Sequence, residues 1–491
     1  MTLDAAAAYQ AIVARDARFD GRLFVGVTST GVYCRPICRV RTPMRQNCRF
    51  FDSAARAEAA SFRPCMKCRP EIAPGSALPW TVMDASATLA RQAATALDEP
   101  GDEPLSVAAL AERLGVSERH LRRIFAAEHG VTPSQYVQTR RLLLAKHLLT
   151  DTRLPVAQVA LSSGFRSLRR FNAAFVGSYR MNPSRLRRAT TAETTAAEAG
   201  DGSVTVNLGY RAPYDHAALL RFIDDRAIDG IERVAGLGVR RSVRAGVVGE
   251  ADGWIEATFR PEAAQVRVRF AAALVPASGR LVAAVRRWLD LDAAPDAIDA
   301  SLHDLPGAPG LRLPGSLDAF ELTVRAVLGQ QVTVAAARTL ACRMAERFGA
   351  QAATPWPDID RTFPAPQCLG AAAVADIAGL GIVRSRAEAI AAIARDWPAL
   401  TTVLQRRSDP ERAIERLCEL PGIGPWTAHY IAMRVLGWPD AFPPGDVAVL
   451  KAMAQRFGAA SAKAALAQAR SWQPWRSYAV LRLWDSLRKP T

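Results

Sequence analysis

The sequence lacks long hydrophobic runs. No stretch reaches the ~20 apolar residues that a membrane-spanning helix needs, and the first ten residues have neither the basic nor the apolar region of a signal peptide. Cysteine is also scarce, because 8 cysteines in 491 residues are too few for the disulfide framework of a secreted protein. We therefore expect a cytoplasmic protein with no membrane partner.

Acidic residues are in deficit. The chain has 63 Lys+Arg against 47 Asp+Glu, a formal charge of +16. Residues 1–190 hold 28 basic and 15 acidic residues, so most of the excess lies there. Such a charge is typical of a protein that binds nucleic acid, and an anionic membrane surface is the second possibility. The apolar share of 49% excludes wholesale disorder, and the length predicts about three domains at roughly 100–200 residues each.

Five of the eight cysteines lie between Cys34 and Cys68. Two of them are four apart, Cys34 and Cys38, and two are three apart, Cys65 and Cys68. Two short pairs on separate turns can converge into the tetrahedral thiolate site that zinc prefers, and four scattered core cysteines are the alternative. Cys48 does not fit the pairing and is interpreted as a packed thiol.

The segments TGVYCRPICRVR (30–41) and FRPCMKCRPE (62–71) resemble the N-terminal domain of Ada-type methylation-response regulators. The resemblance implies one Zn²⁺ on the four paired cysteines, both structural and nucleophile-activating. It also implies that Cys34 accepts a methyl group from a DNA methylphosphotriester, once per protein, and structural zinc without transfer is the alternative. Four arginines would hold the neighbouring phosphates: Arg35, Arg39, Arg41 and Arg69. Loss of the metal is expected to unfold residues 5–75 and to leave the C-terminal half little affected.

Two helix-turn-helix patterns follow in tandem between residues 105 and 177, joined by a long helix predicted from Pro133 to Leu149. In the first, Ser117 would cap a second helix that presents Arg119, Arg122 and Arg123 to DNA. In the second, the corresponding residues are Arg169 and Arg170. The pair resembles the AraC-type DNA-binding domain over residues 84–188, although Arg180 replaces a usual glycine; plain helical core is the alternative.

The segment LPGIGPWTA (420–428) predicts a hairpin between helices. Gly422 and Gly424 let backbone N–H groups approach a DNA phosphate, as in a ligase, a helicase or a glycosylase, and an ordinary helical hairpin is the alternative. Asp446 follows shortly after and could stabilise positive charge on a sugar whose glycosidic bond is breaking. An exposed structural aspartate is the competing interpretation.

Residues 204–487 resemble the AlkA-type 3-methyladenine DNA glycosylases of the helix-hairpin-helix superfamily, on this hairpin together with segments 311–337 and 472–484. The resemblance implies that Asp446 is catalytic and that alkylated purines are bound by Trp426, Tyr430, Trp484 and Gln330. Trp426 occupies the position of the lysine of strand-cutting relatives, which implies a monofunctional enzyme. Gln331 replaces a wedging leucine and Val447 an aromatic residue. The acceptor motif for O6-methylguanine is not found in the sequence, so that repair is not expected.

We therefore expect a multidomain, mainly α protein. Its predicted parts are a small zinc-bound α/β domain (1–78), an AraC-type tandem helix-turn-helix domain (79–190), a linker (191–203), a small mixed α+β domain (204–290) and an all-α helix-hairpin-helix glycosylase domain (291–491). Alkylated and promoter double-stranded DNA are the expected partners, with RNA polymerase, and a monomer associated with the bacterial nucleoid is expected. Two rivals stay open: a regulator whose glycosylase half is only a DNA clamp, and a glycosylase whose front half is only a zinc-bound targeting module.

Overall fold

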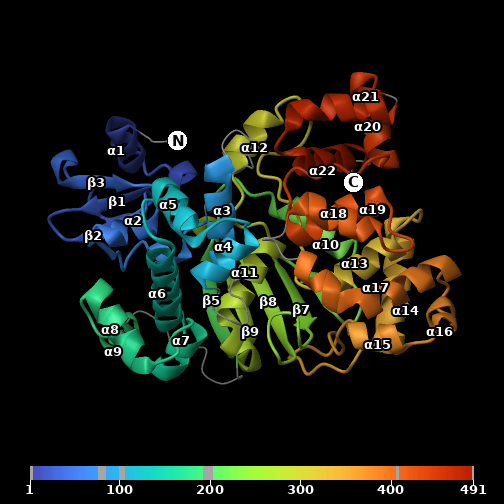
Figure 1. The fold of residues 1–491 in the computed structure, drawn as a ribbon, viewed down its shortest axis with the longest axis horizontal. Helices are drawn as coiled ribbons and strands as arrows, with labels where there is room; N and C mark the ends of the chain where they lie inside the picture. The colour runs from blue at the N-terminus through green and yellow to red at the C-terminus, as the bar shows by residue number, and fades with distance from the viewer. Residues whose placement is uncertain are drawn as a thin grey trace. The chain divides into compact units, whose positions relative to one another are not determined.

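The computed structural model describes residues 4–75, 85–98, 106–191, 203–404, 409–459 and 461–488 (Figure 1). They form two compact units, of which unit 1 holds residues up to 212 with 260–283 and 291–293, and unit 2 holds the remainder. The predicted boundary at 78/79 and all but the ends of the predicted linker 191–203 lie outside the described residues. Within the described ranges, no helix is long and apolar enough to cross a membrane.

Residues 4–75 form what we call the cysteine module, a four-stranded sheet with short helices. Its elements are α1 (Ala5–Val13), β1 (Phe24–Val27), β2 (Val32–Cys34), β3 (Cys48–Phe51), α2 (Ala54–Ala59), β4 (Arg63–Pro64) and the 3₁₀ turn η3 (Pro70–Ile72). The strand order is β3-β1-β2-β4, with β1 antiparallel to β2 and β3, and β4 parallel to β2. Parallel strands end at the same edge of a sheet, so the residues that follow β2 and β4 lie together there.

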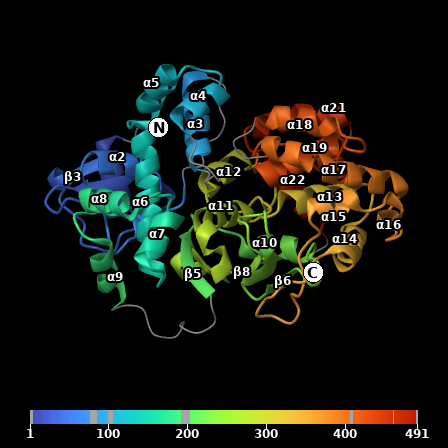
Figure 2. The same cartoon turned by 60° about the horizontal axis from the view of Figure 1, so that its bottom comes forward.

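Residues 85–191 form the helix-turn-helix module, which is entirely helical in the described part. Its helices are α3 (Ala85–Asp98), α4 (Val107–Arg113), α5 (Glu118–His129), α6 (Pro133–Asp151), α7 (Val156–Ser162), α8 (Leu168–Tyr179) and α9 (Pro183–Thr191). Figures 1 and 2 show α5 toward one end of the long helix α6 and α7 toward its other end. The predicted long helix is confirmed, and so is the cap at Ser117, whose hydroxyl accepts the His120 N–H at 3.2 Å.

A five-stranded sheet follows. Its elements are β5 (Ser203–Gly209), α10 (His216–Asp224), β6 (Glu232–Ala235), β7 (Gly238–Val243), β8 (Gly253–Arg260), β9 (Gln265–Ala271), α11 (Ser278–Trp288) and α12 (Pro295–Ser301). The strands are hydrogen-bonded in the order β5-β9-β8-β7-β6, in which β5 pairs with β9, β6 with β7 and β7 with β8, each pair antiparallel. The alternation that predicted strands at 204–210 and 266–270 is confirmed, with Val206 opposite Val268 and both side chains buried.

The rest of unit 2 is helical. Its helices are α13 (Ala319–Leu328), α14 (Val334–Phe348), α15 (Pro366–Ala371), α16 (Val374–Ala378), α17 (Arg384–Val403), α18 (Pro410–Cys418), α19 (Pro425–Ile431), α20 (Val447–Phe457), α21 (Ala462–Ala469) and α22 (Arg476–Ser486). A π-helical segment, Ala432–Leu436, continues α19. Buried apolar residues of α13, α17 and α19, such as Phe320, Ile390 and Ile431, share one core that fixes these helices. The multidomain, mainly α fold class is confirmed.

Candidate functional sites

The four paired cysteines meet at one edge of the first sheet. Cys34 ends β2 and Cys65 follows β4, while Cys38 and Cys68 lie in the turns beyond. Their four sulfur atoms lie within 4.8 Å of one another. Three of these side chains are buried and Cys68 is half-buried. The sequence spacing therefore predicted this cluster correctly, because the parallel pairing of β2 with β4 brings the two turns together.

The donor set fits a zinc ion. Hydrogen bonds with the other three thiols raise the pKa of Cys34, since four crowded sulfurs cannot all ionise on their own. A tetrahedral dication removes that conflict, and four thiolates are the commonest structural ligand set of Zn²⁺. The predicted cofactor, one Zn²⁺ held by these cysteines, is thus supported by the geometry and the chemistry of the site.

The sulfur of Cys68 accepts a hydrogen bond from the backbone. The donor is the Arg35 N–H, at 3.3 Å from Cys68 Sγ. A donated hydrogen bond withdraws negative charge from a thiolate, so this bond would weaken the Cys68 thiolate as a nucleophile.

The expectation that four arginines hold phosphates is wrong for two of them. Arg35 is 5% exposed and forms an ion pair with Asp20, and Arg69 forms ion pairs with Glu71 at 3.0 Å and Asp151 at 2.6 Å. Arg39 and Arg41 are exposed, as expected. Exposed Lys67, between two of the cysteines, is a basic residue that the sequence reasoning missed. Cys48 is a packed thiol as interpreted, with its S–H donating to the Met44 carbonyl at 3.4 Å.

The predicted DNA-contacting arginines of the helix-turn-helix module are all exposed. In the first pair of helices they lie on α5, where Arg122 Nε donates to Glu118 at 3.0 Å and Arg123 Nη2 lies 3.1 Å from His120 Nδ1. In the second pair, Arg169 and Arg170 lie on the first turn of α8. Each set therefore projects from the start of the second helix of its pair, where a recognition helix contacts the major groove.

The predicted hairpin joins α18 to α19. Gly422 has φ +80°, and a Cβ atom there would lie 2.8 Å from the Ala389 side chain, so only glycine fits. Gly424 caps α19 and has open space around it. Gln330 donates from Nε2 to the Gly422 carbonyl at 2.8 Å and to Thr427 Oγ1 at 3.0 Å. The structure therefore places the Gln330 amide on the hairpin.

Asp446 is held by three hydrogen bonds. Its Oδ1 accepts the Val449 N–H at 2.8 Å, which caps α20, and the Trp484 indole N–H at 3.0 Å. Its Oδ2 accepts the Trp426 indole N–H at 2.8 Å. A carboxylate offers about four acceptor positions, so one acceptor position on Oδ2 is not used by these three bonds. The three donors fix the orientation of this carboxylate.

A cavity of about 420 Å³ lies beside Asp446 in unit 2. Trp426, Tyr430 and Trp484, which the resemblance implies as base-binding residues, line this cavity, with the first two rings stacked at 5.4 Å and 6° between their planes. The cavity also takes Phe222 from α10 and Arg226 from the following turn, which sequence reasoning missed. Both lie far from the hairpin along the chain, so no local motif could have placed them. The Gln330 side chain is not among the residues that line this cavity.

Arg226, Arg325 and Arg434 are among the arginines that line the cavity, and their charges act on Tyr430. Arg434 Nη1 donates to the Tyr430 hydroxyl at 2.7 Å. Burial raises the pKa of Tyr430, but the charges of these arginines outweigh burial and lower the pKa overall. The Tyr430 oxygen therefore faces a strongly positive wall.

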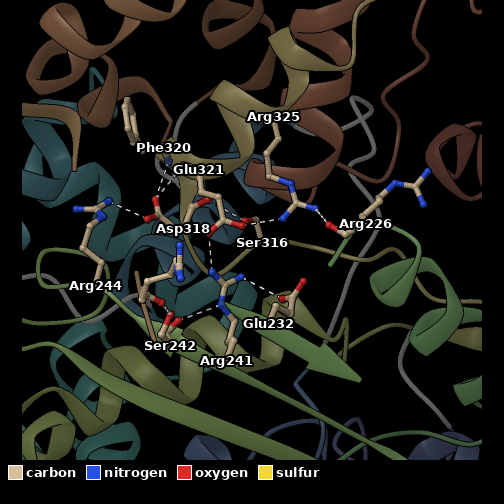
Figure 3. Close-up of polar contacts among 11 residues, drawn as sticks. Arg226, Glu232, Arg241, Ser242, Arg244, Ser316, Asp318, Phe320, Glu321 and Arg325 are labelled. Atoms are coloured by element: carbon tan, nitrogen blue, oxygen red, sulfur yellow. Dashed lines mark hydrogen bonds and ion pairs between the residues drawn. The ribbon is translucent and has the colours of Figure 1, made fainter. Parts of the chain in front are cut away.

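A buried ionic network supports that wall (Figure 3). Arg241 on β7 reaches Glu232 at 3.2 Å and Glu321 on α13 at 2.5 Å, and Glu321 accepts from Arg325 at 2.7 Å. Arg325 in turn donates to the Arg226 carbonyl. Because each buried charge has an opposite partner, the network fixes α13 against the strands of its own unit.

Known domain families match four successive parts of the chain. They are the metal binding domain of Ada (residues 7–71), a helix-turn-helix domain (110–189), the AlkA N-terminal domain (205–318) and the HhH-GPD superfamily of base excision DNA repair proteins (324–477). The fold and these sites define a metal-binding, DNA-binding regulator fused to a base-excision DNA repair protein.

Three curated relatives extend the match. A probable bifunctional transcriptional activator/DNA repair enzyme AlkA from Mycobacterium tuberculosis is 37% identical over 98% of this chain and 96% of its own length. DNA-3-methyladenine glycosylase 2 of Escherichia coli is 37% identical over 56% of this chain and 95% of its own. The bifunctional transcriptional activator/DNA repair enzyme Ada of Escherichia coli is 35% identical over 27% of this chain and 35% of its own.

The chain belongs to the family of bifunctional transcriptional activator/DNA repair enzymes in which Ada-type regulatory domains precede an AlkA-type glycosylase. The Ada-type, AraC-type and AlkA-type resemblances are thereby confirmed.

Proposed function

We propose that this protein repairs alkylated DNA by two reactions and reports the damage to transcription. Its C-terminal part hydrolyses the N-glycosidic bond of alkylated purines, as a DNA-3-methyladenine glycosylase. Its cysteine module accepts a methyl group from DNA methylphosphotriesters onto Cys34. The observation that carries the first activity is the Asp446 carboxylate, fixed by two indole N–H groups beside an aromatic cavity.

Excision follows from the charge at Asp446. As the bond between the base nitrogen and the sugar carbon breaks, its electron pair leaves with the base and positive charge grows on the sugar. The Asp446 carboxylate stabilises that charge without reorganising, because its donors already hold it in place. The unused acceptor position on Oδ2 can orient or deprotonate the water that attacks the sugar carbon. An alkylated purine already carries positive charge, so its departure needs no strong acid.

We infer a monofunctional enzyme. Strand cutting requires an amine that attacks the sugar, and Trp426 occupies the hairpin position where lyase relatives carry lysine. The Trp426 indole instead donates to Asp446. The expected product is an intact strand with an abasic site. The ring faces of Trp426 and Trp484 favour a flat, electron-poor base over a normal one.

Methyl transfer follows from the sulfur environment. The Cys34 sulfur attacks the methyl carbon of the phosphotriester: an S–C bond forms, the C–O bond breaks, and the electron pair stays on the departing phosphodiester oxygen. A bound Zn²⁺ would keep all four thiols ionised at neutral pH. Cys34 is proposed as the acceptor because the resemblance to the Ada metal binding domain assigns that role to the first cysteine of the set. The reaction consumes the protein, since no step restores the thiolate.

Regulation follows from the loss of one negative charge. Methylation turns the Cys34 thiolate into a neutral thioether, so the basic front half binds DNA phosphates more tightly. The exposed arginines of α5 and α8 would then hold a promoter, with RNA polymerase as the partner and with the protein, as a monomer, bound to the nucleoid. A pure regulator and a zinc-targeted glycosylase are the rival functions.

Excision by the full chain with Asp446→Asn tests the proposal. Asparagine still caps α20, but it replaces the charge, so release of methylated purines from duplex DNA should fall ~10²-fold or more while binding to an abasic analogue is kept. Asp409→Asn is the matched control, because Asp409 caps α18 and lies outside the cavity. Equal excision by the wild type and Asp446→Asn would refute the assigned role.

A further inference from the structure

Arg35, which follows the first metal-ligand cysteine, points into the protein. Its Nη1 donates to the Cys68 carbonyl at 3.0 Å, in addition to the backbone bond to the Cys68 sulfur. Its Nε donates to the Asp20 carboxylate at 2.7 Å. Arg35 therefore connects the turn that carries a metal ligand with Asp20 beneath it.

Arg211, just beyond β5, continues this connection within unit 1. It is 1% exposed, and its Nε donates to the Asp20 carbonyl at 2.9 Å. Its Nη1 donates to the carbonyls of Asp292 and Ala293 at 2.7 and 3.1 Å, and its Nη2 to that of Gly75. A buried guanidinium is costly unless its N–H groups are bonded, so Arg211 holds these segments together.

A second connection starts at Arg69, which follows another ligand, Cys68. Its ion-pair partner Asp151 accepts the Asn207 backbone N–H on β5 at 2.8 Å and the Asn207 side-chain amide at 3.2 Å. Its other partner, Glu71, accepts from Lys146 on α6 at 2.5 Å. The loop after the last two cysteines is thus bonded to the helix-turn-helix module and, through Asp151, to β5.

The backbone of β5 also approaches the backbone of the cysteine module closely. A Cβ atom on Gly209, at the end of β5, would lie 2.5 Å from the carbonyl oxygen of Ile72 in η3. The Gly75 N–H donates to the Asp292 carboxylate at 2.6 Å. Together these contacts form what we call the junction; its residues are Asp20, Arg35, Arg69, Asp151, Asn207, Gly209 and Arg211.

We propose that the junction is an interaction surface through which the metal site and the first strand of the glycosylase part stabilise each other. Metal binding fixes the two cysteine turns. Arg35 and Arg69 directly follow ligand cysteines in the sequence, so fixing the turns also fixes the hydrogen bonds and ion pairs that connect these arginines to β5. The expectation that metal loss unfolds residues 5–75 and leaves the C-terminal half little affected changes accordingly, because β5 of that half should also lose order. This inference goes beyond the proposed reactions and requires only that the cysteines hold the metal.

Reciprocity supplies the test. If the metal favours docking of β5, then disturbing the docking of β5 weakens metal binding by the same factor. Gly209→Ala disturbs the approach to Ile72, because the new methyl carbon would lie 2.5 Å from its backbone oxygen, while Arg35 Nη2 lies at 3.5 Å, an ordinary contact distance. Gly238→Ala on β7 is the matched control, with 3.3 Å to its nearest neighbour, a threonine hydroxyl.

The zinc-loaded full chain is titrated with EDTA and metal release is measured. We expect Gly209→Ala to lose its zinc at an EDTA concentration about fivefold or more below that of the wild type, and Gly238→Ala to behave as the wild type. Equal zinc retention by the two variants would overturn the proposal.

A second measurement uses the wild type alone, so it does not depend on a variant that folds. Zinc is removed, and hydrogen exchange is followed on β5 and on the β6–β7 hairpin of the same sheet. The Asn207 N–H, which donates to Asp151, should exchange at least about fivefold faster, with no change in the hairpin. Unchanged exchange on β5 would also overturn the proposal, whatever the excision and methyl-transfer assays give.

Discussion

Single residues in this protein combine structural and chemical tasks. Asp446 caps a helix and presents a fixed carboxylate to the cavity, and Trp426 both lines that cavity and donates to the carboxylate. The sequence could single out Asp446 and Trp426 because the glycine hairpin and the aspartate that follows it are local patterns. Gln330 shows the opposite case, since its hairpin partners Gly422 and Thr427 are distant in sequence and no local pattern indicates them.

Arg180 gives a prediction at this scale. It ends α8 with φ +53°, the left-handed conformation that Gly130 adopts at the end of α5 with φ +67°. The departure from glycine at this position therefore leaves the turn intact at the cost of strain. Arg180→Gly should raise the free energy of unfolding of the helix-turn-helix module by about 1 kcal/mol, measured by denaturant unfolding.

The control for Arg180→Gly is a glycine-to-alanine exchange at another left-handed position, in the turn between α4 and α5 of the first motif. Gly115 has φ +67°, and a methyl group added there would have no atom within 4 Å, so Gly115→Ala should cost about 1 kcal/mol through strain alone. Equal stability of Arg180→Gly and the wild type would mean that Arg180 is not strained.

Whole elements show what spacing can and cannot predict. The two cysteine pairs predicted one metal site, because four thiols on two turns can converge into a single tetrahedral set. The same segments led to the wrong expectation for Arg35 and Arg69, since their acidic partners Asp20 and Asp151 belong to other elements. Charge counts alone cannot separate an arginine that faces DNA from one that faces a buried carboxylate.

Helix α2 of the cysteine module carries a prediction about pH. Glu58 accepts from Tyr33 at 3.1 Å and from Thr139 on α6 at 3.0 Å. Burial raises the pKa of Glu58 from 4.5 to about 8, although these hydrogen bonds lower it. The folded chain therefore keeps this proton between those two values while the unfolded chain releases it. The Glu58 contribution to stability is present below pH 4.5 and is lost as the pH rises toward 8.

Glu58→Gln tests this assignment, because an amide does not titrate. Denaturant unfolding of the full chain at about pH 5 and about pH 8 should show a smaller loss of stability with rising pH in Glu58→Gln than in the wild type. Glu112→Gln, at an exposed position on α4, is the control and should follow the wild type. Identical pH dependence in all three proteins would show that Glu58 is ionised in the folded chain.

At the scale of the whole molecule, the order of the four parts was predictable and their connections were not. Each part has its own local signature, from paired cysteines to the glycine hairpin. The junction depends on Arg211, Asn207 and Gly209, which are ordinary residues of a strand and its turn until the fold brings them beside the cysteine module. In the proposed account the domains therefore do not fold independently, and metal binding by the cysteine module stabilises β5 of the glycosylase part.

The central claim is that one chain performs two separate reactions on methylated DNA. A duplex methylated with a radiolabelled methyl donor carries label on both purines and phosphates, and one incubation yields two products. The wild type should release labelled purines into solution and also become labelled itself. Cys34→Ser should release purines without becoming labelled, and Asp446→Asn should become labelled while releasing ~10²-fold less. Loss of both products in either variant, or label on the Cys34→Ser protein, would contradict the account.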